Sequence, residues 1–311
     1  MRLANKKREK QRSISISLAN MNYLFRKIKN IKRKLFLSPF PGTYSSPIVD
    51  GAEMRKREEE IFSIKSKDIP GIELNENNQL NLLKEFEGYY HYVPFKDLKS
   101  DHRYFYENGY YLHSDAIFLY SMIRHFHPRR IIEIGAGFSS AAMLDSTDVL
   151  GYRDTTFAFI DPEPARLKAL LRNEDYARST IFECTLDNVD AAVFDSLKKN
   201  DILFVDSSHV CKTGSDVNRV FFEILPKLKS GVLIHFHDVF FPFEYPKSWV
   251  LDWNSFGWNE DYFLRAFLMY NSNFEIVFFN TFLEHFYEER FKARMPDCLK
   301  HRGGSLWMRR K

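Results

Sequence analysis

Acidic and imidazole side chains occur together in two short segments of the chain. One segment reads Asp206-Ser-Ser-His209 and the other His237-Asp238, and each follows a run of apolar residues. Carboxylates and imidazoles bind divalent cations, and an imidazole also exchanges protons near neutral pH. We therefore interpret Asp206, His237 and Asp238 as a candidate metal site. His209 is the candidate general base, with Asp206 as a second catalytic residue.

A structural role is the alternative for these histidines, because imidazoles near loops often only hydrogen-bond the backbone. That alternative is weaker for a whole set of side chains at two strand ends than for any single histidine. His235 lies further from its strand end, and we expect it to be structural.

A glycine-containing segment reads Glu133-Ile-Gly135-Ala-Gly137-Phe-Ser139. Glycines at these positions let the backbone pass close to a ligand at the start of a helix. As a dinucleotide fingerprint the motif is incomplete, because Ser140 occupies the third glycine position. Glu133 suits a cationic ligand better than a pyrophosphate. A plain strand followed by a turn is the alternative.

Two further acids follow the next apolar segments. Asp161 ends the second predicted strand, where a carboxylate can accept both hydroxyls of a ribose. Glu163 is the alternative there, although it can instead serve as a negative charge at a helix start. Asp187 follows the third predicted strand, where a side chain could meet the edge of an adenine.

The elements that must position these residues alternate along the chain. Short apolar runs predict buried parallel strands, and amphipathic stretches between them predict helices. This alternation predicts a doubly wound parallel sheet, whose ligands bind beyond the carboxyl ends of the strands. The predicted strands are at 131–134, 156–160, 180–184, 202–205, 231–236, 274–279 and 304–309. The predicted helices are at 114–126, from 139, and at 163–172, 190–198, 214–228 and 260–271.

The N-terminal part of the chain is different in charge. Residues 1–35 hold twelve basic side chains and one acid, whereas the remaining 33 basic and 40 acidic side chains leave the rest at −7. We predict a basic arm over 1–37, in which residues 21–35 form an amphipathic helix that contacts an anionic membrane or a partner. A helix docked on the body and a mitochondrial presequence are the alternatives. Residues 38–110 are predicted to be a linker and an accessory region.

Composition excludes several classes of protein. Apolar residues make up 44% and charged residues 28%, which excludes a wholly disordered or fibrous chain. Three scattered cysteines do not form a disulfide framework, so we expect a reducing, cytoplasmic location, with peripheral membrane contact at most. The acidic body is not expected to bind nucleic acid. The chain contains no run of 18 apolar residues, so we predict no transmembrane helix.

The motifs resemble a known family. The segment from Glu133 to Gly137, then Asp161, then an acid ending the fourth strand, is similar to class I S-adenosylmethionine-dependent methyltransferases. Asp206-Ser-Ser-His-Val-Cys-Lys-Thr-Gly-Ser-Asp-Val-Asn218 and His237-Asp-Val-Phe-Phe-Pro-Phe-Glu-Tyr-Pro246 resemble methyltransferase family 24 more narrowly. Gly303-Gly-Ser-Leu-Trp307 is also similar to that group. The resemblance covers residues 105–310 and gives a methyltransferase domain over 111–311.

The resemblance implies an α/β, Rossmann-like, seven-stranded sheet with an antiparallel last strand, and S-adenosylmethionine as methyl donor. Glu133, Gly135 and Gly137 would face the amino-acid part of the donor. Ser139, at the start of the following helix, is a further candidate for donor binding. Asp161 would bind the ribose. In the metal-dependent members an acid stands where this chain has His237, and an imidazole shifts preference from Mg²⁺ toward Mn²⁺, Fe²⁺ or Zn²⁺.

The predicted activity is methyl transfer to a hydroxyl of a sugar, a glycan or another small molecule. The segment 240–246 is aromatic and would form a wall of the acceptor pocket or pack on the core. A non-catalytic binding protein with the same fold is one alternative. A nicotinamide-dependent oxidoreductase is another, which the missing third glycine and Glu133 disfavour. The oligomeric state does not follow from the sequence.

Overall fold

The structure, a computed structural model, describes residues 42–251 and 257–311. The predicted basic arm, residues 1–37, lies outside the described residues. Contacts divide the chain into two units. The described part of the first unit comprises residues 42–61, 247–251 and Gly257, and it contains α2 (Gly51–Lys56) and α10 (Lys247–Leu251). Nη2 of Arg55 donates a hydrogen bond to the Leu251 carbonyl at 3.0 Å and links these two helices.

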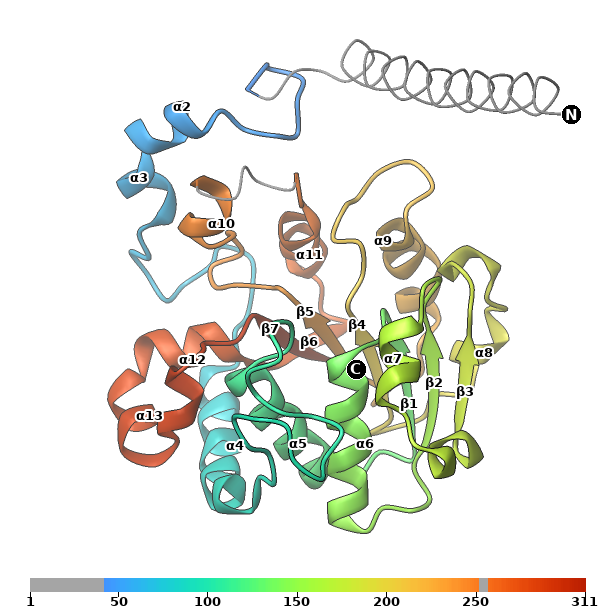
Figure 1. Ribbon diagram of the computed structural model, residues 1–311. Helices are drawn as coiled ribbons and strands as arrows, with labels where there is room; N and C mark the ends of the chain where they lie inside the picture. The colour runs from blue at the N-terminus through green and yellow to red at the C-terminus, as the bar shows by residue number, and fades with distance from the viewer. Residues whose placement is uncertain (1–41, 252–256) are drawn as a thin grey trace, which may run out of the picture. The chain divides into compact units, whose positions relative to one another are not determined.

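The second unit, residues 62–246 and 258–311, contains one seven-stranded sheet in the order β3-β2-β1-β4-β5-β7-β6 (Figure 1). Strands β1 to β5 pair in parallel, whereas β7 runs antiparallel to both of its neighbours. The bounds are β1 Arg130–Ile134, β2 Thr156–Ile160, β3 Ser179–Phe182, β4 Ile202–Val205, β5 Leu233–His237, β6 Phe274–Phe279 and β7 Ser305–Arg310. The predicted doubly wound sheet with an antiparallel last strand is confirmed.

The central strands are apolar because helices cover both faces of the sheet. All four residues of β4 are buried, and so are all five of β5. Parallel strands with two covered faces read as near-continuous apolar runs, which is the pattern that predicted them. His235 and His237 are the polar exceptions in β5.

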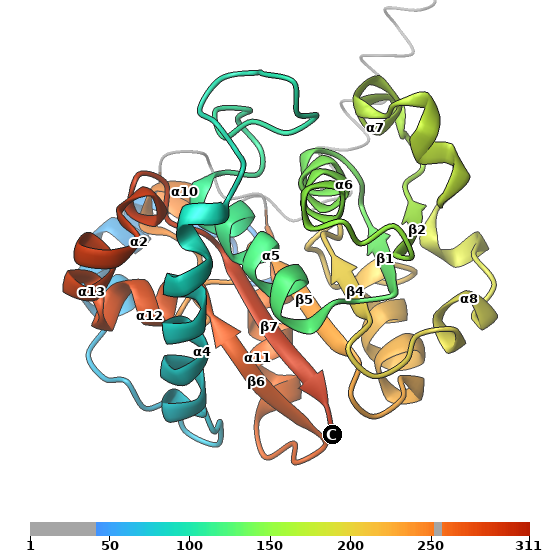
Figure 2. The same ribbon diagram turned by 90° about the horizontal axis from the view of Figure 1, so that it is seen from below.

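Ring contacts show which helices cover which face. Phe118 of α5 and Phe86 of α4 pack on Phe278 of β6, whereas Phe221 packs on Phe236 of β5 from the other side. Helices α5 and α6 pack against each other (Figure 2). The longer helices are α3 Glu58–Phe62, α4 Glu76–Tyr89, α5 His113–Phe126, α6 Phe138–Leu150, α7 Ala165–Leu170, α11 Glu260–Leu268, α12 Asn280–Phe286 and α13 Glu288–Arg294. The shorter ones are η1 Tyr90–Tyr92, η2 Asn173–Ala177, η3 Leu186–Asn188, α8 Ala192–Asp195, α9 Asp216–Arg219, η4 Val220–Ile224, η5 Leu225–Lys227 and η6 Pro296–Leu299.

The helix predicted over 214–228 is present but irregular. It begins as α9, widens into one π-helical turn at η4 and ends as the 3-10 turn η5. Pro226 lies in the last turn and has no backbone N–H to donate, so the regular helical hydrogen-bond pattern cannot continue there.

Other predicted helices are shorter than expected, and α10, α12 and α13 were not predicted. The segment predicted over 163–172 is helical only from Ala165 to Leu170, and that over 190–198 only from Ala192 to Asp195. Helices α12 and α13 fill the connection between β6 and β7, which the sequence analysis left unassigned. Phe282, Leu283 and Phe291 of this helical pair are buried.

Candidate active site

The ends of β1, β4 and β5 bring the predicted site together. These strands are direct neighbours in the sheet, so the loops that follow them meet at its carboxyl edge. Gly135 follows β1 with a φ of +78°, and a Cβ there would collide with the backbone carbonyl of Asp206. Only glycine allows the two loops to approach this closely.

A cavity of about 410 Å³ opens at this edge between the loops after β1, β2, β3 and β4. Three predicted site residues line it, namely Gly135, Asp187 and Asp206. The other lining residues are Ile134, Ile160, Pro162, Thr185, Leu186, Ser207, Ser208, Lys212, Gly214, Ser215 and Asp216. The cavity therefore lies where the sequence placed a nucleoside-containing donor.

The remaining predicted donor residues support the glycine loop from behind. Glu133 is fully buried, and its carboxylate accepts hydrogen bonds from the hydroxyls of Ser139, at 2.5 Å, and Ser140. Burial raises the pKa of Glu133 to about 8. The Ser140 hydroxyl also accepts a hydrogen bond from the Gly137 backbone N–H at 3.0 Å.

Asp161 links two of the loops at the cavity. One carboxylate oxygen accepts from the Ala136 backbone N–H at 2.9 Å, and the other accepts from the Glu163 backbone N–H at 2.7 Å. The glycine loop and the start of the β2–α7 connection are thereby held to one carboxylate. Contact of Asp161 with a ribose stays a prediction.

The two Asp/His segments converge, as their strand order predicted. Nε2 of His209 lies 3.3 Å from Oδ1 of Asp206 and 3.5 Å from Oδ2 of Asp238. Nδ1 of His237 lies 3.5 Å from the same Asp206 oxygen and 3.6 Å from the same Asp238 oxygen. Donor atoms of Asp206, His209 and Asp238 all lie within 4.8 Å of one another, a spacing that could hold a metal ion.

Both loops carry a residue in a conformation that side chains rarely adopt. His209 and Asp238 each have a φ of +57°. The left-handed region is costly for a residue with a Cβ and persists where the surrounding structure fixes it, most often at functional sites. The strain therefore falls on the two loop residues whose side chains meet.

Two carboxylates that the sequence analysis missed complete the cluster. Glu260, in the first turn of α11, lies 2.9 Å from Nδ1 of His209 and also accepts from the Ser207 hydroxyl. Asp115, in the first turn of α5, lies 3.6 Å from Nε2 of His237. Their sequence signal is only that of acids at helix starts, which is common for helix-capping reasons alone.

The imidazoles and carboxylates change each other's pKa values. Burial opposes the charged form of His209, but hydrogen bonds with Asp206 and Glu260 outweigh it and raise its pKa to about 10. Burial would raise the pKa of Asp206, but the charges of His237 and His209 outweigh it and hold that pKa well below its usual value. Burial raises the pKa of Asp238.

The donor set fits a divalent cation. The carboxylates of Asp115, Asp206, Asp238 and Glu260 outnumber the two imidazoles. Nδ1 of His237 is buried and has no hydrogen-bond partner among the described residues. An unpartnered buried nitrogen beside two carboxylate oxygens is a set of donor atoms that suits a divalent cation.

His235 lies behind this cluster and makes no polar contact. Its ring stacks on Phe204 at 3.9 Å between centroids and packs against Trp307 at 4.5 Å. Within the described part of the chain both ring nitrogens lack a hydrogen-bond partner, and burial lowers the pKa of His235 well below its usual value. A neutral imidazole inside the sheet is compatible with the expected structural role.

The aromatic segment 240–246 packs mainly on the core. Phe241 and Phe243 are 4% and 1% exposed and contact Phe279. Among the described residues, the ring of Trp258 packs on His209 instead, with 4.3 Å between the two centroids. Trp258 was not singled out in the sequence, because it is remote from every motif.

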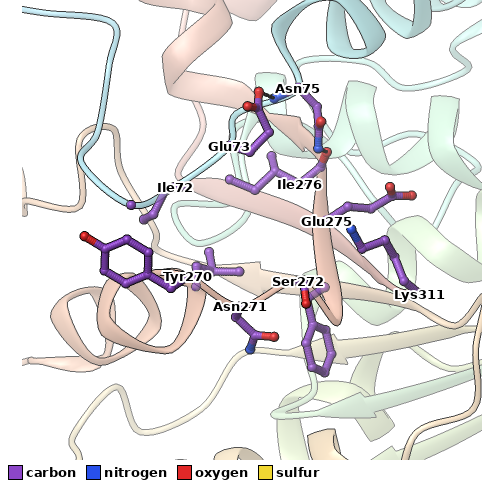
Figure 3. A pocket seen from close by; sticks show the side chains of 12 residues that line it. Ile72, Glu73, Asn75, Tyr270, Asn271, Ser272, Glu275, Ile276 and Lys311 are labelled. Carbon is purple, nitrogen blue, oxygen red and sulfur yellow. Dashed lines mark hydrogen bonds between the residues drawn. The ribbon is translucent and has the colours of Figure 1, made fainter.

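A second cavity, of about 330 Å³, lies at the start of β6 (Figure 3). Strand β6 runs parallel to β5, so its start is at the opposite edge of the sheet from the imidazoles. Tyr270, Asn75 and Glu275 are among its lining residues, and no lining residue is a histidine or cysteine. No residue predicted to bind the donor or a metal lines this second cavity.

Comparison with known proteins places the domain. Residues 132–239 match a family described as "Methyltransferase domain". A protein of Archaeoglobus fulgidus described as "Uncharacterized protein" is 32% identical over 170 residues, covering 52% of this chain and 75% of that protein.

Two solved structures show a more distant likeness. The SAH-bound methyltransferase PaMTH1 of Podospora anserina is 16% identical, covers 84% of this chain and 94% of that one, and has a TM-score of 0.40. The O-methyltransferase TomG of Streptomyces achromogenes, in complex with SAM, is 16% identical, covers 77% and 92%, and has a TM-score of 0.41. The sheet order defines the fold independently of these two likenesses.

The sheet order and the glycine loop define the class I S-adenosylmethionine-dependent methyltransferases as the class of this protein. Within that class, the chain belongs to the family whose methyltransferase domain matches residues 132–239, as its two long motifs predicted. Across residues 42–251 and 257–311, no helix combines the length and apolarity needed to cross a membrane.

Proposed function

We propose that this protein transfers the methyl group of S-adenosylmethionine to a hydroxyl oxygen. The observation that carries this proposal is that Asp206 belongs to both parts of the site. It lines the 410 Å³ cavity, and its Oδ1 lies 3.3 Å from His209. A donor in that cavity and an acceptor at the imidazoles would therefore meet at one residue.

The donor would occupy the cavity with its nucleoside toward β2 and β3. Gly135 allows the close approach of the glycine loop, and Glu133 fixes that loop through Ser139. Asp161 is proposed to bind the ribose. Asp187, which lines the cavity beside η3, is proposed to contact the adenine.

In the proposed reaction the acceptor oxygen forms a bond to the methyl carbon while the carbon–sulfur bond breaks. The electron pair of that bond goes to sulfur and leaves S-adenosylhomocysteine, and the hydroxyl proton goes to Nε2 of His209. Glu260 holds Nδ1 of the same ring, so Nε2 is the nitrogen that faces the acceptor. Alignment of the two reactants is worth about 7–11 kcal/mol, and a positioned base about 10²–10⁴-fold in rate.

Asp206, His237 and Asp238 are proposed to hold a divalent cation. When bound, that cation would supply positive charge that lowers the pKa of the acceptor hydroxyl and of the neighbouring imidazole. Without it, hydrogen bonds with Asp206 and Glu260 raise the pKa of His209 and favour the protonated ring. Proton transfer to His209 therefore requires a positively charged site, to which the sulfonium of the donor also contributes.

The acceptor is proposed to be a sugar, glycan or other ring-bearing molecule with a free hydroxyl. The half-buried indole of Trp258 beside His209 supports a flat ring as the binding partner.

Contact of residues 21–35 with an anionic membrane is proposed on the sequence alone. Binding of the full chain to phosphatidylserine vesicles, and its loss when Arg26, Lys29 and Arg33 are replaced by Glu, tests that contact.

Calorimetric titration with S-adenosylhomocysteine tests the donor site first, with EDTA and then with Mn²⁺ or Mg²⁺. Micromolar binding supports the proposal, and absence of binding at millimolar ligand contradicts it. The matched variants are Asp161→Asn, which is expected to weaken binding at least tenfold, and Asp154→Asn, whose exposed carboxylate lies away from the cavity lining. His209→Ala is expected to bind S-adenosylhomocysteine normally but to lose turnover with any accepted hydroxyl substrate.

A further inference from the structure

The imidazoles of His209 and His237 lie in similar positions but differ in their hydrogen-bond partners. Each directs one nitrogen at Oδ1 of Asp206 and Oδ2 of Asp238, at distances from 3.3 to 3.6 Å. His209 is 5% exposed and His237 is 7% exposed, so bulk water has little access to hydrogen-bond either ring.

His209 already has hydrogen-bonding partners. Its Nδ1 lies 2.9 Å from Glu260, and its Nε2 is the closer of the two inner nitrogens to Asp206, at 3.3 Å. The His209 ring therefore has a hydrogen bond at Nδ1 and an ion-pair contact at Nε2 without a further ligand.

Nδ1 of His237 differs from the nitrogens of His209 in its hydrogen bonding. It is buried without a hydrogen-bond partner among the described residues, although two carboxylates lie at 3.5 and 3.6 Å. Buried polar atoms in proteins are nearly always partnered, so an orphan aimed at two carboxylate oxygens points to a ligand that would lie between them. Of the two imidazoles, His237 is therefore the one with an unpartnered buried nitrogen.

The other nitrogen of His237 faces Asp115 across 3.6 Å. Both oxygens of Asp115 are fixed from elsewhere: Asn280 Nδ2 donates to Oδ1 at 3.3 Å, and the Gly304 backbone N–H donates to Oδ2 at 3.3 Å. Gly303 approaches so closely that a Cβ there would collide with Asp115 Oδ1. Helix α5 and the Gly-Gly pair before β7 thus hold this carboxylate against the imidazole.

We propose that Asp115 is a positioning residue for a metal ligand: it takes the Nε2–H of His237 and so presents the Nδ1 lone pair to the gap between Asp206 and Asp238. His237, rather than His209, is then the nitrogen ligand of the cation. A carboxylate behind a ligating imidazole fixes its tautomer and orientation and raises its basicity. The inference rests on the proposed function only in that the site takes a cation.

The test is a titration of the full chain with Mn²⁺ alone, in which electron paramagnetic resonance measures the concentration of the free ion. Asp115→Asn is expected to weaken Mn²⁺ binding about 10–100-fold, because a neutral amide holds the Nε2–H more weakly than a carboxylate and does not raise the basicity of the ring. Glu284→Gln is the matched control, since Glu284 is a buried acid beside α5 that bonds Ser114 and not His237. Its Mn²⁺ affinity is expected to change less than threefold.

Two alanine variants separate the imidazoles. His237→Ala is expected to lose Mn²⁺ binding at least 100-fold, and His209→Ala to retain it within about threefold. The reverse order, or unchanged Mn²⁺ affinity in Asp115→Asn, would overturn the inference. Binding of S-adenosylhomocysteine by each variant shows that the fold is intact, and its absence from the wild type would contradict the proposed methyl transfer instead.

A measurement on the unmodified chain keeps the test valid if a variant does not fold. In ¹⁵N NMR of the protein loaded with Zn²⁺, the His237 ring is expected to show a metal-bound Nδ1 and a protonated Nε2. A metal-bound Nε2 of His209 with an unbound His237 would overturn the assignment. So would a wild type that binds neither Mn²⁺ nor Zn²⁺ at millimolar concentration.

Discussion

Oε2 of Glu260 lies 2.9 Å from Nδ1 of His209, although the two residues belong to different elements and are 51 positions apart. The His209 ring is held in turn against Asp206 and Asp238 by its other nitrogen. An acid on one ring nitrogen orients a histidine base in many enzymes, and here that acid is Glu260 on Nδ1. Glu260 therefore acts on the acceptor's proton only through His209.

Replacement of this acid by an amide tests its role. Glu260→Gln is expected to lower turnover about 10²-fold or more, because the amide no longer fixes the tautomer or stabilises the protonated ring. S-adenosylhomocysteine affinity is expected to stay within about twofold. Steady-state rates with an accepted substrate, paired with calorimetry, check both parts.

Asp261→Asn is the matched control for that variant. Asp261 is the next residue of α11, is equally buried, and accepts from the Phe240 backbone N–H instead of from His209. If the two variants lose turnover equally, the effect comes from the helix start and Glu260 has no particular part in the reaction.

The fold could be predicted from the sequence because its signals are local. Apolar runs such as Ile202–Val205 mark buried strands, and residues such as Gly135 and Asp206 directly follow such strands. Their convergence then follows from the order of parallel strands, which brings the ends of β1, β4 and β5 to one edge. The irregular helix after β4 was the exception, since the effect of Pro226 depends on its place in the turn.

Glu260, Asp115 and Trp258 could not be predicted, because tertiary packing alone brings them to the site. Asp115 arrives on a helix that precedes β1, and Glu260 on one that follows β5. Neither has a spacing relation to the motifs that contact it. Nothing in the sequence distinguished the orphan Nδ1 of His237 from the partnered His209 ring either, since partner geometry is a property of the assembled loops.

The glycine loop offers a test of close backbone approach. Gly135→Ala is expected to destabilise the protein by about 3 kcal/mol or more, because a positive φ and a collision with the Asp206 carbonyl combine. Gly109→Ala is the control: its φ is +81°, but nothing lies within 4 Å of its Cβ. It should cost only the left-handed strain, about 1–2 kcal/mol. Urea unfolding measures both, and equal losses would show that the collision is relieved at no cost.

His235 is expected to lower the free energy of unfolding, because its buried ring nitrogens make no hydrogen bonds that offset their burial. Both ring nitrogens are buried without partners in the described part of the chain. His235→Leu should therefore raise the free energy of unfolding by about 1–2 kcal/mol, because it removes unsatisfied polar atoms from an apolar site. His125→Leu is the comparison, since the His125 ring contacts the Tyr89 hydroxyl at 3.4 Å and should gain nothing. A loss of stability in His235→Leu would mean that a partner satisfies the imidazole in solution.

Glu284 predicts how stability depends on pH. Burial raises its pKa from 4.5 in the ordinary state to about 8 in the folded protein. The folded state therefore holds a proton that the unfolded chain releases, so this residue makes stability fall as pH rises from about 4.5 to about 8. Glu284→Gln removes that contribution, and its advantage in melting temperature over the wild type should widen from pH 5 to pH 8. Glu288→Gln, nearer the surface, should show no widening of this kind. If the difference in melting temperature between Glu284→Gln and the wild type is the same at every pH, the Glu284 carboxyl is not protonated in the folded state.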